Sequence, residues 1–453
     1  MWPGPLGARA TFPRSLRPRD NRPMPAPPVS QNQGAPAGGR YWLKTLGCPK
    51  NQVDSDKLEG TLAADGMTPV DSPEEADLIV VNTCAFIDAA REESIETVMA
   101  ASAARADGAR VVVTGCLAER YGEELATALP EVDKVAGFGV PVTFGSKPGS
   151  PGSVGPALPE FDLLNLPRPP ARAPWAYVKV AEGCDRACGF CAIPSFRGKQ
   201  RSRLAEAVLA EVDRLEAKEI VLVAQDLASY GRDLGRAGEI VDLVDAVAAR
   251  VARTRLLYLY PSDLTDRLVD AICRTGVPYF DLSLQHVSRP LLRRMRRWGD
   301  GGRFMERINT IREREPDAAL RSSFIVGYPG ETEADHDALL AFVEEAQLDW
   351  ATFFRYSPEA GTYATGLDGA VDRALMNERL HELSELQDAI TFERRNRLIG
   401  ETIEVLVDSP GEGRTHREAP EIDGIVRVPD DLLPGQFATL EVTGVAGVDL
   451  EAA

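Results

Sequence analysis

The first folded part of the chain repeats one pattern: a short apolar run, a cysteine, and then a segment in which apolar residues recur at helical spacing. The runs YWLKTLGC, ADLIVVNTC and RVVVTGC end at Cys48, Cys84 and Cys116. Strands that alternate with helices predict a parallel sheet, whose functional residues gather beyond the carboxyl ends of the strands. We therefore predict an N-terminal open parallel α/β sheet over residues 41–142, with these three cysteines at one edge.

A second series of apolar runs begins at Trp175. The strand candidates are WAYVKVAEG, EIVLVAQD, TRLLYLYP, YFDLSLQH, LRSSFIVGYPG and DWATFFRYSP. They recur about every 35 to 40 residues, which leaves room for one crossover helix between successive parallel strands. Six such units over residues 175–395 predict a central partial (β/α)6 barrel with its site at the carboxyl ends of the strands.

The rest of the chain shows other patterns. From residue 396, the runs ETIEVLVDS, IDGIVRVP and QFATLEVTG alternate apolar and polar positions between Gly and Pro turns, which predicts a small antiparallel β-barrel over residues 396–453. The Pro- and Gly-rich segment 143–174 is predicted to be a linker. Residues 1–40 have no periodicity and are predicted to be disordered, or a mis-assigned start with Met24 as the true initiator. The whole chain is thus expected to be a multidomain α/β protein.

Charge narrows the choice of partners. The 453 residues carry a formal charge of −18, and residues 1–40, with six Arg against one Asp, make the remainder still more acidic. From residue 396 onward there are twelve acidic residues and four Arg. Such a surface disfavours nucleic acid and favours a basic protein. No apolar run is long enough to cross a bilayer and no secretory signal is present, so we expect a cytoplasmic protein without a membrane partner.

The strongest chemical signal is the stretch VAEGCDRACGFCAIPSFRG, which places Cys184, Cys188 and Cys191 in one loop after the first strand of the predicted barrel. A structural zinc site almost always has four protein ligands. Three cysteines on a four-iron cluster leave one iron open to a cofactor that carries an amine and a carboxylate. The alternatives are a zinc site completed by a distant residue such as His286, or three unrelated thiols.

The three strand-end cysteines of the N-terminal sheet form a second candidate set. A single cysteine at a strand end is commonly a buried apolar residue. Three at matching strand ends indicate ligands, and we interpret Cys48, Cys84 and Cys116 as holding a second cluster with one open iron. Cys273 fits a core thiol, and no chemistry is assigned to it.

The loop and the predicted barrel resemble the radical S-adenosylmethionine (SAM) superfamily. Together with the N-terminal cysteine domain and the small C-terminal β module, they resemble the methylthiotransferase family over nearly everything from Tyr41 to the end. The resemblance implies two [4Fe-4S] clusters, SAM, and transfer of a methylthio group to an unactivated carbon by a radical mechanism. Four positions at predicted strand ends are candidate SAM contacts, although each also fits a turn residue or a structural hydrogen bond: Gln225, Ser283, Gln285 and Gly327.

Two branches of the family differ in substrate. The stretches CAIPSFRGKQRSR, AQDLASYGRDLG, MRRWGDGGRF and GRTHREAPEIDG are similar to the branch that modifies an aspartate of ribosomal protein uS12. The alternative is the branch that modifies an adenosine of transfer RNA, for which a basic C-terminal module is expected. The basic run of Arg293, Arg294, Arg296 and Arg297 stays unassigned. The resemblance further implies an electron donor protein and a sulfur donor. An alternative from another class is a zinc-stabilised scaffold that binds a ribosomal partner without chemistry.

Overall fold

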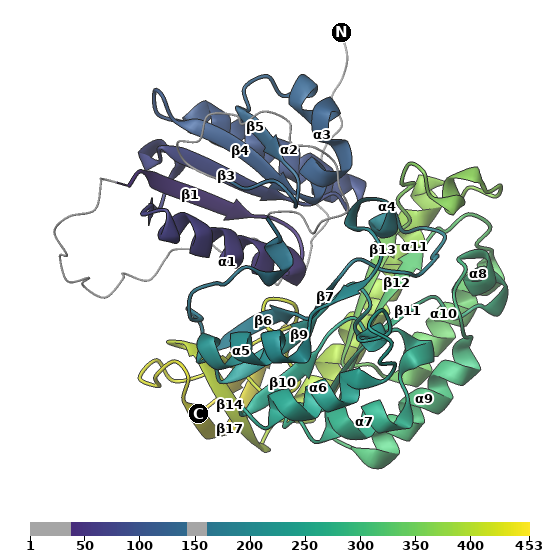
Figure 1. Cartoon of the computed structure of the whole chain (residues 1–453). Coiled ribbons are helices and arrows are strands. Elements are labelled where there is room, and N and C mark those ends of the chain that lie inside the picture. Colours follow the sequence, from purple (N-terminus) through teal and green to yellow (C-terminus); the bar gives the residue numbers. More distant parts are fainter. Residues whose placement is uncertain (1–37, 143–160) are drawn as a thin grey trace, which may run out of the picture.

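The computed structural model describes residues 38–142 and 161–453. The predicted disordered start therefore lies outside the described residues except for residues 38–40, and the predicted linker is described only from residue 161. Three units follow one another along the chain: an N-terminal unit (residues 40–136), a central unit (175–396) and a C-terminal barrel (402–452). Figure 1 shows them in purple to blue, teal to green, and yellow.

The N-terminal unit is a parallel five-stranded sheet in the order β2-β1-β3-β4-β5. Its strands are β1 (Arg40–Thr45), β2 (Thr68–Pro69), β3 (Leu78–Thr83), β4 (Arg110–Gly115) and β5 (Lys134–Ala136). Its helices are α1 (Pro49–Ala64), α2 (Asp88–Ala104) and α3 (Cys116–Ala128). The central strand β3 is buried along its whole length, because both faces of a parallel sheet are covered. The predicted parallel sheet is confirmed.

The central unit arranges six parallel strands in chain order. Two three-stranded sheets, β6-β9-β10 and β11-β12-β13, are joined by a single parallel bridge between Leu259 and Leu282. The strands are β6 (Trp175–Lys179), β9 (Glu219–Val223), β10 (Arg253–Leu256), β11 (Tyr279–Gln285), β12 (Ala319–Val326) and β13 (Trp350–Arg355). This is the predicted partial barrel of six units.

Helices cover the outside of these strands. They are α5 (Ala205–Leu215), α6 (Glu239–Ala248), α7 (Asp266–Cys273), α8 (Arg289–Arg294), α9 (Gly301–Arg314), α10 (Glu333–Ala346) and α11 (Arg373–Asn396). A two-stranded hairpin, β7 (Ala181–Glu182) with β8 (Arg201–Ser202), encloses the short helix α4 (Ile193–Arg197). Short 3-10 turns are η2 (Pro73–Glu75), η3 (Leu163–Asn165), η4 (Leu227–Ser229), η5 (Pro261–Asp263) and η6 (Tyr363–Gly366). None of the described helices is long and apolar enough to span a membrane.

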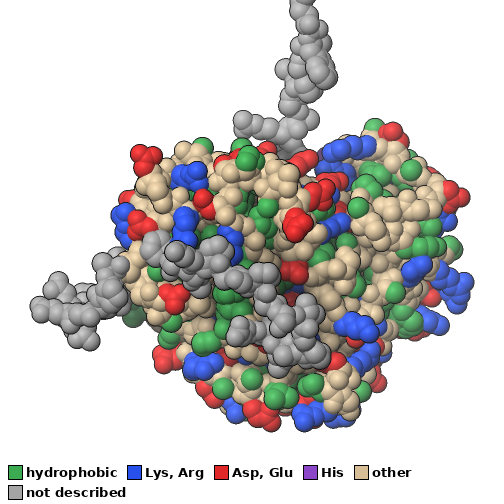
Figure 2. All heavy atoms as spheres, turned by 45° about the horizontal axis from the view of Figure 1, so that its top comes forward, with side chains coloured by type: hydrophobic (Ala, Val, Ile, Leu, Met, Phe, Trp, Pro, Cys, Tyr) green, Lys and Arg blue, Asp and Glu red, His purple; other side chains and the backbone are tan. Residues whose placement is uncertain are grey.

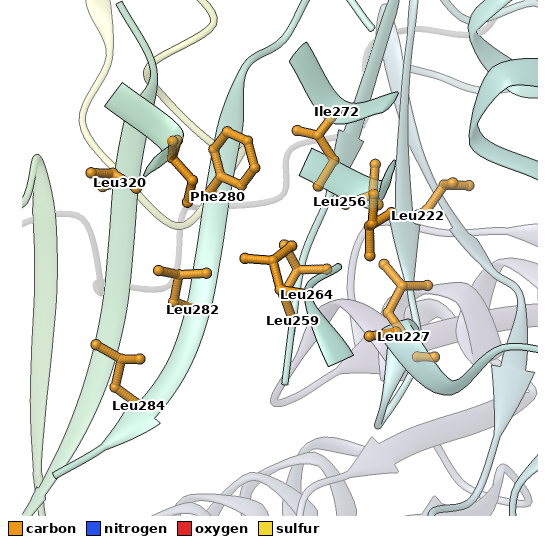
Figure 3. Packing of buried hydrophobic residues seen from close by; sticks show 14 of the residues in the cluster. Leu222, Leu227, Leu256, Leu259, Leu264, Ile272, Phe280, Leu282, Leu284 and Leu320 are labelled. Atoms are coloured by element: carbon orange, nitrogen blue, oxygen red, sulfur yellow. The ribbon is translucent and has the colours of Figure 1, made fainter. Parts of the chain in front are cut away.

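The main hydrophobic core lies between the central strands and their helices. In Figure 3, Phe280, Leu282 and Leu284 of β11 point into a layer that also receives Leu222 of β9. Ile272 of α7 closes this layer from the helical side. Burial of such side chains stabilises the fold by roughly 1.5–3 kcal/mol each, so this layer fixes the strands whose carboxyl ends carry the site.

The C-terminal module is a closed barrel in the order β14-β15-β16-β18-β17. Its strands are β14 (Thr402–Ser409), β15 (Glu412–Arg414), β16 (Val426–Arg427), β17 (Phe437–Ala446) and β18 (Asp449–Ala452). Four of its pairings are antiparallel, but β16 and β18 run parallel. The predicted antiparallel barrel is therefore correct except for this pair, which closes the barrel between strands that are distant in sequence.

The two outer units attach to opposite ends of the central strands. The C-terminal barrel contacts their amino ends: Glu219, the first residue of β9, accepts a hydrogen bond from buried Arg414 at 3.0 Å, and the Tyr177 hydroxyl donates to the Pro420 carbonyl at 2.7 Å. The N-terminal unit contacts the carboxyl ends, where Asp54 of α1 pairs with buried Lys179 at the end of β6. Figure 1 shows the corresponding placement above and below the strands.

A second contact of the N-terminal unit involves the segment after β13. Arg91 of α2 and Arg120 of α3 both donate to the carboxylate of Glu359, at 2.5 and 2.7 Å. The Glu359 side chain is only 4% exposed. This three-residue contact, here called the Glu359 clamp, holds the N-terminal unit over the carboxyl ends of the central strands.

Candidate functional site

Three cysteines of the central unit lie in the loop that joins β7 to α4. Backbone hydrogen bonds fix the loop: the Cys184 amide donates to the Gly198 carbonyl at 3.1 Å, and the Gly189 amide donates to the Met295 carbonyl at 2.8 Å. Burial raises the pKa of the Cys184 thiol to about 11 and that of Cys191 to about 12. Nearby thiols, Cys188 in both cases, add to both shifts. The structure thus brings Cys184, Cys188 and Cys191 together at the carboxyl ends of the strands.

Two arginines border this loop on the barrel side. The Arg297 guanidinium lies 3.4 Å from the Cys188 sulfur and stacks on the Tyr260 ring at 4.0 Å. Arg186 covers Tyr260 at 3.9 Å and donates to Asp226 at 2.6 Å. The sequence predicts no role for Arg297, and Arg186 is not among the predicted site residues. The position of Arg186 between Cys184 and Cys188 is the sequence signal that could have identified it.

The three cysteines of the N-terminal unit lie at the carboxyl ends of three neighbouring strands. Cys48 is the residue before α1, Cys84 follows β3, and Cys116 is the first residue of α3. Burial raises the pKa of Cys84 to about 12, with further contributions from Cys48 and Cys116. Burial acts on Cys48 in the same direction, but the cations of Lys50 and Arg197 outweigh it and lower the pKa of that thiol.

A buried amide organises this edge of the N-terminal sheet. The Asn51 side chain donates to the carbonyls of Leu46 and Thr83, at 2.9 and 3.0 Å, and so joins the ends of β1 and β3. Its carbonyl oxygen accepts from Arg197 at 2.8 Å and lies 3.5 Å from the Cys116 sulfur. Asn51 was not predicted, because Thr83 and Arg197, two of its partners, are distant in sequence.

Among the described residues, neither cysteine set is arranged as a site for a single metal ion. Across residues 38–142 and 161–453, no group of three or more His, Cys, Asp or Glu side chains is placed to hold one. The zinc alternative also fails on His286, which is fully buried and whose charged neighbours are Asp335, His336 and Arg379. Three thiols per set, with cations beside Cys48, Cys116 and Cys188, suit an anionic iron–sulfur cluster.

The candidate SAM contacts lie at the carboxyl ends of the strands. The Gln225 side chain, just after β9, donates to Glu182 at 2.5 Å. In β11, the Ser283 carbonyl accepts from Arg297, and Gln285 has a left-handed backbone with φ of 73°. Gly327 follows β12 with φ of 80°. Contact of these residues with SAM stays a prediction.

The junction of the N-terminal and central units lies beside both cysteine sets. Arg197 of α4 donates to the Cys116 sulfur at 3.0 Å, and its other nitrogen donates to both oxygens of Glu182 at 2.9 Å. On a second side, the Lys50 ammonium lies 3.2 Å above the ring of Tyr258, which follows β10. Burial raises the pKa of Tyr258, and the Cys48 thiol adds to this shift. One junction thus holds both sets.

Comparisons with known proteins agree with this division of the chain. Three family models match: the uncharacterized protein family UPF0004 over residues 40–137, the radical SAM superfamily over 178–343 and the TRAM domain over 399–453. Ribosomal protein uS12 methylthiotransferase RimO of Kineococcus radiotolerans is 41% identical, covering 90% of this chain and 96% of that protein.

A second relative and a solved structure complete the comparison. The protein of the same name from Salinispora tropica is 41% identical, covering 94% of this chain and 97% of its own. The structure of the radical SAM methyltransferase TsrM from Kitasatospora setae aligns with a TM-score of 0.48 and 14% identity, over 78% of this chain and 89% of that one.

Proposed function

Because the chain belongs to the family of uS12 methylthiotransferases, we propose that it attaches a methylthio group to the β-carbon of an aspartate of ribosomal protein uS12. The observation that supports the proposal is the pair of three-cysteine sets beside one junction, at the carboxyl ends of the central strands. One cysteine set would be enough for many radical SAM reactions. A second cysteine set beside it could hold the cluster that provides the sulfur.

The match to the radical SAM superfamily implies SAM and one [4Fe-4S] cluster, for which Cys184, Cys188 and Cys191 are the proposed ligands. A second [4Fe-4S] cluster on Cys48, Cys84 and Cys116 is the finer part of the proposal. When bound, these groups supply the radical and the sulfur that an unactivated C–H bond requires, since no general base can open such a bond.

The protein's own residues position these groups and exclude water. Arg297 and Arg186 enclose Tyr260 beside the radical SAM loop and place two cations near its thiols. Cys84, Cys116 and Cys184 are buried, so each set has at least one thiol shielded from solvent. The Glu359 clamp keeps the N-terminal unit over the barrel, so one substrate carbon can approach both sets.

Charge supports a protein substrate. The C-terminal barrel carries the acidic excess predicted from its sequence, and exposed acidic residues such as Glu401, Asp430 and Asp431 lie on its surface. Complementary charge favours encounter with a basic ribosomal protein and opposes a transfer RNA backbone. An electron donor protein and a sulfur donor complete the proposed set of partners.

The test is an anaerobic reaction of the iron–sulfur-reconstituted protein with SAM and a strong reductant. A uS12 loop peptide and transfer RNA are both present, and mass spectrometry detects an added methylthio group. We expect the gain on the aspartate of the peptide alone. A methylthio group found on the RNA alone would assign the chain to the transfer RNA branch. A colourless protein that contains zinc would indicate a zinc-stabilised scaffold that binds a ribosomal partner without chemistry.

A further inference from the structure

One side chain from the segment after the radical SAM loop reaches a cysteine of the N-terminal set. Arg197 is the last residue of α4, the short helix that begins two residues after Cys191. Its side chain, 2% exposed, leaves the central unit and enters the N-terminal unit. There it stacks on the Phe138 ring at 4.1 Å and reaches Cys116.

The two terminal nitrogens of Arg197 serve different partners. Nη2 donates to the Cys116 sulfur at 3.0 Å and to the Asn51 carbonyl oxygen at 2.8 Å. Nη1 donates to Glu182 at 2.9 Å and to Asp54 at 3.3 Å. A planar guanidinium can hold such a divided arrangement, whereas the point charge of an ammonium cannot. The orientation of Nη2 toward the sulfur is therefore fixed by the carboxylates on the other side.

Two carboxylates pair with Arg197. Lys179 also pairs with both of them, Asp54 and Glu182, so two cations face two carboxylates; three of these side chains are buried and Glu182 is partly exposed. The Lys50 cation lies close enough to act on Arg197 and Lys179 as well. A thiolate at Cys116 adds negative charge next to this group, and the Nη2 hydrogen bond is the direct compensation for it. Hydrogen bonds to the sulfurs and the net charge around a cluster are principal determinants of its reduction potential.

We propose that Arg197 is a positioning residue through which the radical SAM loop holds the N-terminal cysteine set and raises the reduction potential of the cluster bound there. The inference rests on the proposed function, because it assumes the second cluster. Since α4 begins two residues after Cys191, a displacement of the loop would also withdraw the hydrogen bond from Cys116. Arg197 thus links the position of one cluster to the electron affinity of the other.

The test isolates the N-terminal cluster in the full chain. A variant with Cys184, Cys188 and Cys191 all replaced by Ala retains only the N-terminal set. Arg197→Gln and Arg197→Lys are added to it separately, and iron content and an electron paramagnetic resonance redox titration are measured. We expect a more negative midpoint potential in Arg197→Gln and an intermediate one in Arg197→Lys, which keeps the charge but loses the divided geometry.

Arg172→Gln is the control, because Arg172 pairs with Glu59 of the N-terminal unit at 2.8 Å and no contact with a cysteine is found for it among the described residues. Its midpoint potential should equal that of the unsubstituted background. An unchanged potential in Arg197→Gln at full iron content, or an equal shift in Arg172→Gln, would overturn this inference but not the proposed function. If Arg197→Gln loads no iron, Arg197→Lys decides by the same criterion. Absence of iron from the triple-alanine background would instead overturn the second cluster of the proposed function, and this inference with it.

Discussion

The thiols of the two sets differ in how easily they lose a proton. Cations lower the pKa of Cys48, whereas burial raises the pKa of Cys84, Cys184 and Cys191 to about 12, 11 and 12. A thiol binds iron as the thiolate, which burial disfavours. The positive charge of the iron must therefore stabilise the thiolates when a cluster assembles. Each set therefore depends on the iron itself, and on nearby arginines, to become ionised.

Replacing the two cysteine sets separately should separate SAM cleavage from methylthio transfer. Ala at Cys184, Cys188 and Cys191 is expected to abolish SAM cleavage, because no cluster remains to donate the electron. Ala at Cys48, Cys84 and Cys116 should leave SAM cleavage that is uncoupled from methylthio transfer. The measurement is chromatographic detection of 5′-deoxyadenosine alongside mass spectrometry of the peptide. Loss of all SAM cleavage in the second variant, with the first cluster still present, would contradict the division.

A buried histidine makes stability dependent on pH. Burial lowers the pKa of His286 to about 4, and His336 and Arg379 oppose Asp335 in this shift. The unfolded chain binds a proton near pH 6.5, so it holds more protons than the folded state between about pH 6.5 and 4. Stability is then full above pH 6.5 and falls on acidification, by about 2 kcal/mol at pH 5. Urea unfolding at pH 7 and pH 5 should show this loss, and His286→Asn should reduce it. An equal loss in the variant would assign the effect to other groups.

At the scale of elements, glycines allow the strand ends of the N-terminal sheet to approach one another. Gly47 precedes Cys48 with φ of 92°, and a Cβ there would lie 2.9 Å from the Cys84 sulfur. Gly115 precedes Cys116 with φ of 90°, and its Cβ would lie 2.5 Å from the Thr83 carbonyl oxygen. The turns that present the cysteines thus have no room for a side chain.

Gly47→Ala should displace Cys84 and lower the iron bound by the N-terminal set. Gly66→Ala is the control, because Gly66 has φ of 80° but no atom within 4 Å of an added Cβ. Both variants carry a backbone strain of roughly 1–2 kcal/mol, and only the first adds the clash. Iron analysis in the triple-alanine background measures the difference. Equal iron content in the two variants would show that the close contact is unimportant.

The sequence predicts elements well where periodicity is long and less well where it is short. The apolar runs of β3, β9 and β12 are unambiguous, since they are buried along nearly their whole length. The strands β2, β5, β8, β15 and β18 were not predicted, because two to four residues are too few to establish an alternation. The parallel pairing of β16 with β18 depends on closure of the barrel, which local pattern does not encode.

At the scale of the whole molecule, the site forms where separate units meet, and this limits what sequence can predict. The cysteines could be identified because they sit at regular positions in a motif and at strand ends. Arg197, Asn51 and Tyr258 could not, because their partners belong to units far apart in the chain. The acidic excess of the barrel was predictable from composition, and Glu401, Asp430 and Asp431 are exposed as charged residues usually are. Burial of Glu418 and Asp423 was not predictable, because it depends on the contact with the central unit.

The acidic barrel gives a prediction about association with uS12. Asp430→Asn combined with Asp431→Asn removes two exposed charges from it and should slow association severalfold at low salt, with a weaker dependence on ionic strength. Surface plasmon resonance at several salt concentrations measures this. Glu74→Gln with Glu75→Gln removes the same charge from an exposed turn of the N-terminal unit. A reduction as large in that control would mean that only overall charge matters.

The Glu359 clamp has a consequence for how this architecture can be inherited. Because one buried carboxylate receives arginines from two helices of the other unit, neither partner can change alone without leaving an uncompensated charge. A chimaera that takes its N-terminal unit from a relative should therefore assemble only when counterparts of Arg91 and Arg120 come with it. In relatives, Arg91, Arg120 and Glu359 are expected to change together. The N-terminal unit and the central unit are then inherited as a pair and are not exchanged separately.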